Sequence, residues 1–258
     1  MLIDTHCHLN YPGLVEDEAG VLARAGEAGV GTFISISTRE NEWLQVIASA
    51  ERNEQVWATV GIHPHEVDKH TGIDTAKLVA AARHPKVVGI GETGLDYYYD
   101  HSDRGQQQTS FRAHIAASRE TGLPLVVHTR NADEDTAAIL QEEMGKGAFP
   151  MVLHCFTSTQ WLADACLELG AYVSLSGIVT FRNAAALKET ARTLPIDRML
   201  VETDTPFLAP VPVRGKTCEP AYVAHTARYL AELRGMSLDA FAECTTANAR
   251  RLFTRISA

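Results

Sequence analysis

Cysteine is scarce in this sequence, and its spacing gives no sign of a disulfide framework. The 258 residues include five cysteines, at positions 7, 155, 166, 218 and 244. An odd count without a C-x-x-C pair is typical of free thiols in a reducing compartment. No apolar run approaches the ~18 residues that a membrane span requires. Because the first predicted strand begins at residue 2, a signal peptide has no room before it, and we expect a cytoplasmic protein.

An excess of positive charge is also missing. Lysine and arginine number 23 against 32 aspartates and glutamates, which gives a formal net charge of −9 at pH 7. Proteins that coat long nucleic acids over their whole surface are usually basic, so the composition argues against that class. A polyanionic substrate would have to be attracted by a local cationic patch and by bound metal cations.

A glycine-rich phosphate loop is absent after the first predicted strand, which counts against an open, doubly wound sheet. Short apolar segments instead alternate with amphipathic segments in eight strand-then-helix units. This pattern predicts an α/β chain folded as one (β/α)8 TIM barrel domain over residues 1–258. The predicted strands are Leu2–Leu9, Thr32–Thr38, Val56–Pro64, Val87–Asp96, Pro124–Arg130, Met151–Phe156, Ala171–Gly177 and Met199–Asp204. The predicted helices are Val15–Ala28, Glu40–Arg52, Thr75–Arg83, Arg104–Glu120, Asp133–Glu143, Gln160–Leu169, Asn183–Thr193, Ala221–Arg234 and Leu238–Arg255.

Histidines are concentrated at the ends of these strands. His6 and His8 share one face of the first strand because side chains alternate along a strand. A lone histidine in an apolar strand is more often a packed core residue than a ligand. Here, however, the carboxyl ends of the strands meet at one mouth of the barrel, where active sites are built. Further histidines and acids lie late in, or close, other predicted strands: His63, His65, Glu92, His128, His154 and Asp204.

These residue types suit a metal site, because imidazole and carboxylate groups bind Zn²⁺, Mn²⁺ and similar ions, whereas Mg²⁺ prefers oxygen ligands. Four histidines and two carboxylates are too many for one tetrahedral centre and suit two metals that share a bridging carboxylate. Glu92 is the natural bridge, and Asp204 could orient or deprotonate the attacking water. Glu202 is interpreted as a residue that holds a ligand in place. The expected metal ligands are His6, His8, Glu92, His128, His154 and Asp204.

Six motifs together resemble the TatD family of metal-dependent hydrolases, in the amidohydrolase-like barrel superfamily, and the resemblance runs over essentially the whole chain. It implies a (β/α)8 barrel, a two-metal centre and deoxyribonuclease activity, often as a 3′–5′ exonuclease. It also implies Mg²⁺ as a possible ion in use beside Zn²⁺ and Mn²⁺. The motifs are Asp4–Leu9, Val60–His65, Gly91–Tyr97, Val127–Arg130, Leu153–Phe156 and Leu200–Pro206.

The resemblance assigns the same six metal ligands as the residue pattern, and it places His63, His65 and Arg130 close to the bound phosphate. Two departures are visible. The segment Arg214–Pro220 reads RGKTCEP where family members commonly have RGKRNEP, and Thr157-Ser158 replaces a turn that usually contains glycine. Neither departure touches an expected ligand, so they bear on substrate preference more than on hydrolysis.

A phosphodiester substrate is also indicated by residues on the loops after the strands, where arginines could grip phosphate and aromatic rings could stack bases of a single strand. The alternative is that these side chains are solvated or pack at the barrel rim. We expect a monomer that acts on single-stranded DNA, with Asp204 and Glu92 as its catalytic carboxylates. The residues concerned are Arg39, Arg104, Arg130, Arg182, Arg214, Lys216, Tyr97, Tyr98, Tyr99, Phe156, Phe181 and Phe207.

Two other functions remain open. The same centre could hydrolyse another ester or an amide, including an aminoacyl-tRNA ester. No lysine occupies the strand positions where a carbamylated bridge would lie, and Glu92 is there instead. The chain could also be a non-catalytic metal-binding scaffold. Cys155 could be a nucleophile, but strand alternation turns it away from the face of His154, which favours a buried free thiol.

Overall fold

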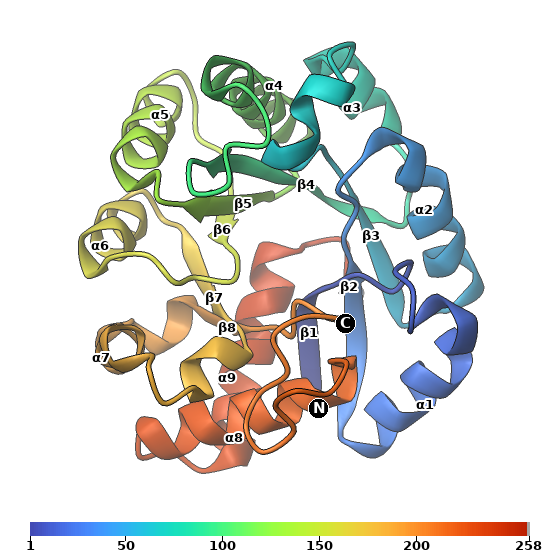
Figure 1. Cartoon of the computed structure of the whole chain (residues 1–258), viewed down its shortest axis with the longest axis vertical. Helices are drawn as coiled ribbons and strands as arrows, with labels where there is room; N and C mark the ends of the chain where they lie inside the picture. The colour runs from blue at the N-terminus through green and yellow to red at the C-terminus, as the bar shows by residue number, and fades with distance from the viewer. Residues whose placement is uncertain (257–258) are drawn as a thin grey trace.

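The chain folds into a parallel β-barrel surrounded by helices (Figure 1). The computed structural model describes residues 1–256, so the last two positions of the predicted domain lie outside the described residues. Every strand pairs in parallel with the next strand along the chain, from β1 to β8. The strands are β1 (Leu2–Cys7), β2 (Val30–Ser35), β3 (Val56–Val60), β4 (Val87–Asp96), β5 (Leu125–Arg130), β6 (Met151–Leu153), β7 (Tyr172–Leu175) and β8 (Met199–Val201).

Backbone hydrogen bonds close the barrel at its carboxyl end. The amide of His8 donates to the carbonyl oxygen of Thr205 at 3.0 Å, and the amide of Asp204 donates to that of His6 at 2.9 Å. A parallel bridge between Cys7 and Thr205 joins the same two segments. The predicted (β/α)8 barrel is therefore confirmed, and its first and last strand segments bring His6, His8 and Asp204 side by side.

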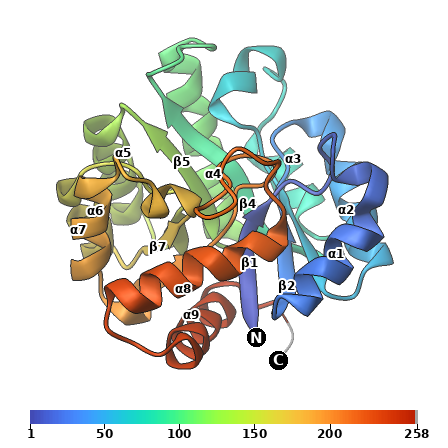
Figure 2. The same ribbon diagram turned by 60° about the horizontal axis from the view of Figure 1, so that its bottom comes forward.

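Helices cover the outside of the barrel (Figure 1), and in Figure 2 α8 crosses in front of β1 while α9 lies below α8. Several helices begin at a side-chain cap, as when Asp103 accepts from the amide of Gln106 and Thr159 accepts from that of Leu162. The helices are α1 (Glu18–Glu27), α2 (Trp43–Arg52), α3 (Thr75–Ala81), α4 (Arg104–Thr121), α5 (Asp133–Gly145), α6 (Gln160–Glu168), α7 (Ala185–Thr193), α8 (Val223–Leu233) and α9 (Leu238–Leu252). Short 3-10 turns lie at Val15–Asp17, Glu40–Glu42, Pro64–Lys69, Gly177–Thr180, Ile196–Arg198 and Pro220–Tyr222.

Two apolar clusters stabilise the barrel. The larger one lies between the sheet and the surrounding helices. The smaller one joins the second residues of several strands, such as Ile3, Val88 and Val126, to Phe253 and Ile256 after α9. The C-terminal segment thus packs against the amino-terminal end of the barrel, and the carboxyl-terminal mouth is left to the polar side chains. None of the helices within residues 1–256 combines the length and the apolar character needed to cross a membrane.

Strand β4 has the predicted bounds and β5 has the predicted end, but the other six strands end two to four residues earlier than predicted. Strands β3, β6 and β8 stop at Val60, Leu153 and Val201, so that His154 and Asp204 follow the strands and do not end them. Asp204 has a positive φ of 60°, and Cys155 has one of 42°. The backbone therefore leaves the sheet at these points, because such left-handed residues do not continue a ladder.

Candidate metal centre

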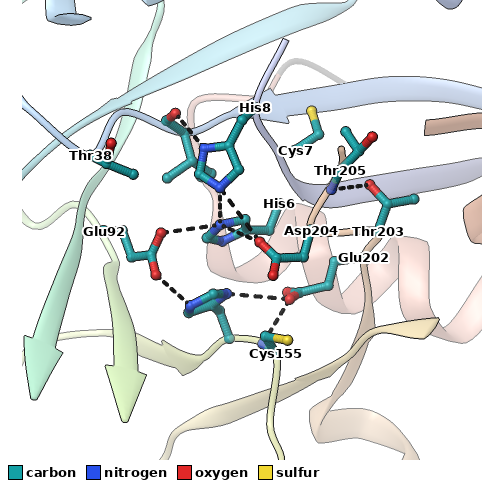
Figure 3. Close-up of polar contacts among 12 residues, drawn as sticks. His6, Cys7, His8, Thr38, Glu92, Cys155, Glu202, Thr203, Asp204 and Thr205 are labelled. Atoms are coloured by element: carbon teal, nitrogen blue, oxygen red, sulfur yellow. Dashed lines mark hydrogen bonds and ion pairs between the residues drawn. The ribbon is translucent and has the colours of Figure 1, made fainter. Parts of the chain in front are cut away.

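All six expected metal ligands lie together at the carboxyl-terminal mouth of the barrel. His6, Glu92 and His128 are within strands β1, β4 and β5, and the others follow the ends of strands. In Figure 3, the side chains of His6, His8, Glu92 and Asp204 point toward one another. A cleft of about 690 Å³ opens above them and is also lined by His63, His65 and Arg130. Eight of the nine sequence-predicted site residues thus line one cleft, and His6 lies buried beside His8, Glu92 and Asp204.

The first donor group consists of His6 Nε2, His8 Nε2, Glu92 Oε2 and Asp204 Oδ1. His6 Nε2 lies 3.3 Å from His8 Nε2, 3.4 Å from Glu92 Oε2 and 3.5 Å from Asp204 Oδ1. His8 Nε2 lies 3.5 Å from the same Asp204 oxygen. Four ligands at ~2.1 Å from a tetrahedral ion are about 3.4 Å apart. The separations of 3.3 to 3.5 Å around His6 and His8 therefore match those between ligands of one divalent cation.

The second donor group surrounds the other oxygen of Glu92. Oε1 of Glu92 lies 2.8 Å from His154 Nε2, 3.2 Å from His128 Nδ1 and 3.3 Å from His63 Nε2. His154 Nε2 and His128 Nδ1 are 3.4 Å apart. The residues present fit a second cation as well. His63, which the sequence analysis placed beside a bound phosphate, is here also a candidate donor to that cation.

Glu92 lies between the two donor groups with only 3% of its surface exposed. Its position depends on Gly91, which has a φ of 140°. A Cβ atom at Gly91 would lie 2.7 Å from the carbonyl oxygen of Val126 in β5. Only glycine allows β4 to approach β5 this closely in this conformation, and the approach brings Glu92 toward His128 and His154.

The distal ring nitrogens of three histidines are held by hydrogen-bond acceptors. Nδ1 of His8 lies 3.1 Å from the carbonyl oxygen of Ile36. Nδ1 of His154 lies 3.3 Å from Glu202 Oε1, and Nε2 of His128 lies 3.2 Å from Asp96 Oδ2. A neutral imidazole that donates through one nitrogen presents the lone pair of the other, which is the form that binds a metal. Glu202 therefore contacts His154 as the sequence analysis expected.

Charges within the cluster shift the pKa values of its members. Burial raises the pKa of Glu92, but the imidazoles of His154 and His63 outweigh burial and lower it well below its usual value. Burial opposes a charge on His154, yet the carboxylates of Glu92 and Glu202 raise its pKa well above the ordinary value. Without a cation, the carboxylates therefore hold a proton on the ring of His154. A bound cation would take the place of that proton.

The aromatic residues named from the sequence differ in their access to the cleft. Tyr98, Tyr99 and Phe207 are 56%, 48% and 52% exposed, so their rings are available for stacking. Phe156 is only 1% exposed, and its predicted role in stacking bases is wrong because the ring packs in the core. The guanidinium of Arg214 lies over the ring of Phe181, with 4.1 Å between Cζ and the ring centroid.

The cationic face expected from the loop arginines is weaker than predicted. Arg39 pairs with Glu42 at 3.2 Å and with Glu66 at 3.1 Å. Arg104 pairs with Asp100 at 2.8 Å. These two guanidinium groups are already neutralised by neighbouring carboxylates. Arg130 instead lies over the rings of two tyrosines, so it is the cleft arginine best placed to meet a phosphate.

Two cysteines near the site, Cys155 and Cys218, are held in buried surroundings. Cys155 lines the cleft, but its Sγ lies 3.2 Å from the hydroxyl oxygen of Ser176, and alternation does not place it because β6 ends at Leu153. Burial raises the pKa of this thiol well above its usual value, which argues against a thiolate nucleophile. Cys218 lies in the segment Arg214–Pro220, which differs from the common family sequence. It is fully buried, and its amide donates to the carbonyl oxygen of Pro206 at 3.0 Å. It supports that loop and has no surface to offer a substrate.

Asp96 is the residue of this site that the sequence analysis did not single out. It ends β4, is 1% exposed, and contacts both His128 and His65. Burial raises its pKa, but hydrogen bonds from His128, His65 and the amide of Tyr99 outweigh burial and lower it. The available signal was an acid at the end of an apolar strand, in Gly94-Leu95-Asp96-Tyr97.

Comparisons with known proteins agree over the whole chain. The family model described as "TatD related DNase" matches residues 3–254. The relative named "Uncharacterized metal-dependent hydrolase YcfH" from Escherichia coli (strain K12) is 44% identical over 255 residues, which are 98% of this chain and 95% of that protein. The "3'-5' ssDNA/RNA exonuclease TatD" of Enterobacter lignolyticus is 35% identical and covers 98% of both chains. The crystal structure of YJJV, a TatD homologue from Escherichia coli K12, matches with a TM-score of 0.91 and 30% identity over 98% of each chain.

Proposed function

This chain belongs to the TatD-related DNase family of metal-dependent hydrolases, and from that premise we propose that it is a two-metal exonuclease. Its substrate is single-stranded DNA, which it shortens from the 3′ end. The observation that carries the proposal is the spacing of the two donor groups around the opposite oxygens of Glu92. The ligands are His6, His8, Glu92, His128, His154 and Asp204, with the barrel acting as a single domain and as a monomer.

The residues around the cleft divide the chemistry among them. Bound Zn²⁺, Mn²⁺ or Mg²⁺ ions would supply a water of lowered pKa and a Lewis acid for a phosphate oxygen. Asp204, whose side chain is 17% exposed toward the cleft, orients the attacking water and accepts its proton. Arg130 donates to the phosphate oxygens and holds the scissile bond in line, beside His65, whose Nε2 is held by Asp96.

The choice of a single strand rests on the shape and lining of the cleft. Tyr99 and Phe207 line it with about half of their surfaces exposed. Such rings stack bases without reading their sequence, and a base must be unpaired to stack on them. The name of the Enterobacter relative, an exonuclease on single-stranded DNA and RNA, supports the same substrate class.

The test is digestion of a 5′-labelled single-stranded oligonucleotide by protein that is stripped of metal and then reloaded. We expect a ladder of products shortened from the 3′ end, and loss of the ladder in His128→Ala with an unchanged circular dichroism spectrum. A duplex and an RNA of the same sequence define the preference. Full activity of His128→Ala would overturn the proposal.

The alternative functions are decided by the same preparation. Ester and amide substrates, including an aminoacyl ester, are assayed in parallel with the oligonucleotide. Turnover of these substrates without cleavage of the oligonucleotide would make the protein a hydrolase of another bond, since the same donor groups can serve it. No turnover of any substrate by metal-loaded protein would favour a non-catalytic scaffold.

A further inference from the structure

Asp96 contacts two separate parts of the site through its two carboxylate oxygens. Oδ2 accepts from His65 Nε2 at 2.7 Å and from His128 Nε2 at 3.2 Å. Oδ1 accepts from the backbone amides of Tyr98 and Tyr99, both at 3.0 Å. One side of this carboxylate therefore faces the second donor group, and the other faces the turn that carries the two exposed tyrosines.

The carboxylate itself has little freedom to move. The amide of Asp96 donates to Gln107 Oε1 at 2.8 Å. Nε2 of Gln107 donates in turn to the carbonyl oxygens of Asp96 at 3.2 Å and Ser102 at 2.9 Å. Gln107 is fully buried in α4. A buried, fully satisfied side chain thus fixes the backbone from which the Asp96 carboxylate projects.

We propose that Asp96 is a positioning residue that couples the second cation to the substrate wall, which is the side of the cleft lined by Tyr99 and Arg130. It holds His128 with Nδ1 toward that cation, and it holds the tyrosine turn (Tyr98 and Tyr99) in place for the substrate. The inference rests on the two-metal centre of the proposed function and goes beyond it, because Asp96 touches neither cation.

The effect on His128 follows from the chemistry of imidazole. A neutral ring carries one N–H, and in His128 this is the Nε2–H that donates to Asp96 Oδ2. Nδ1 of His128 then presents its lone pair on the side of Glu92 Oε1, and these two atoms are 3.2 Å apart. Partners of this kind fix the tautomer and raise the basicity of the ligand, and their loss costs roughly 10–100-fold in metal affinity.

The effect on the substrate wall passes through the tyrosine turn. The guanidinium of Arg130 lies over both rings, 4.3 Å from the centroid of Tyr98 and 4.8 Å from that of Tyr99. The amide of Tyr97 donates to the carbonyl oxygen of Arg130 at 2.9 Å. The Asp96 hydrogen bonds to the turn therefore also set where the Arg130 guanidinium, the proposed phosphate contact, can rest.

An asparagine at position 96 separates the two roles, because an amide has one acceptor where a carboxylate has two. If the amide oxygen of Asp96→Asn serves the tyrosine turn, its NH2 group faces His128 and favours the wrong tautomer. If the oxygen serves His128, the NH2 group faces the two backbone amides and loosens the turn. The matched control is Asp100→Asn in the same loop, since Asp100 is exposed and pairs only with Arg104 among the described residues.

The experiment measures Zn²⁺ binding to metal-free protein by competition with a chromophoric chelator. For Asp96→Asn we expect the first equivalent to bind as in the wild type. If the amide oxygen serves the tyrosine turn, the second equivalent should bind 10–100-fold more weakly. If the oxygen serves His128, a fluorescent single-stranded oligonucleotide in the presence of a chelator should bind several-fold more weakly. Asp100→Asn should match the wild type in both measurements. Wild-type values of Asp96→Asn in both measurements would overturn the proposal.

A second measurement does not depend on whether Asp96→Asn folds. In wild-type protein loaded with Zn²⁺, the 15N chemical shifts of the histidine rings report which nitrogen carries the proton. We expect His128 to be protonated at Nε2 and bound through Nδ1; the opposite tautomer would overturn the proposal. Wild-type protein that binds fewer than two equivalents would instead contradict the two-metal centre itself, so the two failures are distinct.

Discussion

The rings of His6 and His154 stack face to face, with centroids 3.9 Å apart and planes inclined by 10°. His6 belongs to the first donor group and His154 to the second, and their Nε2 atoms approach opposite oxygens of Glu92. Two stacked and buried imidazoles cannot both carry a charge at low cost. Burial and the neighbouring His154 accordingly lower the pKa of His6, whereas Glu92 and Glu202 raise that of His154.

Replacement of Glu92 by glutamine should damage both cation sites at once. Each site would lose a charged ligand, so affinity should fall at both by more than the roughly 10–100-fold that loss of an outer partner costs. Hydrolysis should become undetectable. Metal content after dialysis against a weak chelator measures the effect, with Glu66→Gln, a carboxylate of the cleft rim that pairs with Arg39 and Lys69, as the control. Retention of two equivalents by Glu92→Gln would contradict the bridging role.

Metal binding should release protons and should weaken as the pH falls. In the metal-free protein, burial opposes charging of His8 and His128, but Asp204 raises the pKa of the former, and Asp96 and Glu92 raise that of the latter. The pKa of His154 is raised as well. Protons therefore compete with the metal already above pH 6.5, the ordinary value for histidine. Calorimetric titrations in buffers of different ionisation enthalpy count the released protons; a constant affinity from pH 8 to 6 would contradict this coupling.

A buried histidine outside the centre should make the metal-free protein sensitive to acid. Burial lowers the pKa of His114 in α4 to about 4, while Nδ1 lies 2.7 Å from the Ser110 carbonyl oxygen and Nε2 accepts from the Ile62 amide. Because the folded pKa is lowered, the stabilisation is complete above pH 6.5 and is lost as the pH falls toward 4. The linkage relation gives a loss of about 2 kcal/mol between pH 7.5 and 5.

The variant His114→Gln keeps an acceptor and a donor but cannot titrate. Urea unfolding at both pH values should show that the gap in unfolding free energy between the wild type and this variant narrows by about that amount at pH 5. The comparison uses chelator-treated protein, so that metal binding does not contribute. An unchanged gap would mean that the His114 ring takes up a proton in the folded state without cost.

The barrel and the gathering of the candidate ligands at its mouth could be predicted from the sequence because both depend on local patterns. Strand β4 shows this most clearly, since the segment VVGIG followed by Glu92–Asp96 was enough to predict its bounds. The point where a strand leaves the sheet depends on neighbouring strands, and β6 and β8 were therefore predicted too long at His154 and Asp204. The burial of Phe156 was missed for the same reason.

The role of Asp96 could not be derived from the sequence, because it is created by three segments that meet only in the folded barrel. His65 comes from the turn after β3, His128 from β5 and the tyrosine turn from the loop after β4. A strand pattern assigns a face to each residue but does not specify which side chains meet across strands. The sequence motif around Asp96 thus marked the position without revealing its hydrogen bonds.

Removal of the exposed rings of the cleft should weaken substrate binding more than it slows hydrolysis. Tyr99 and Phe207 line the cleft but are not among the candidate donors, so alanine at either position leaves the cation sites intact. A stacked base contributes roughly 1–3 kcal/mol, which corresponds to a rise in KM of about 5- to 150-fold for a single-stranded oligonucleotide. Trp161 in α6 is 55% exposed outside this cleft and provides the aromatic control, because Trp161→Ala removes a similar surface without touching the substrate path. A fall in kcat with an unchanged KM in Phe207→Ala would show that the ring acts on the reacting bond and does not hold a base.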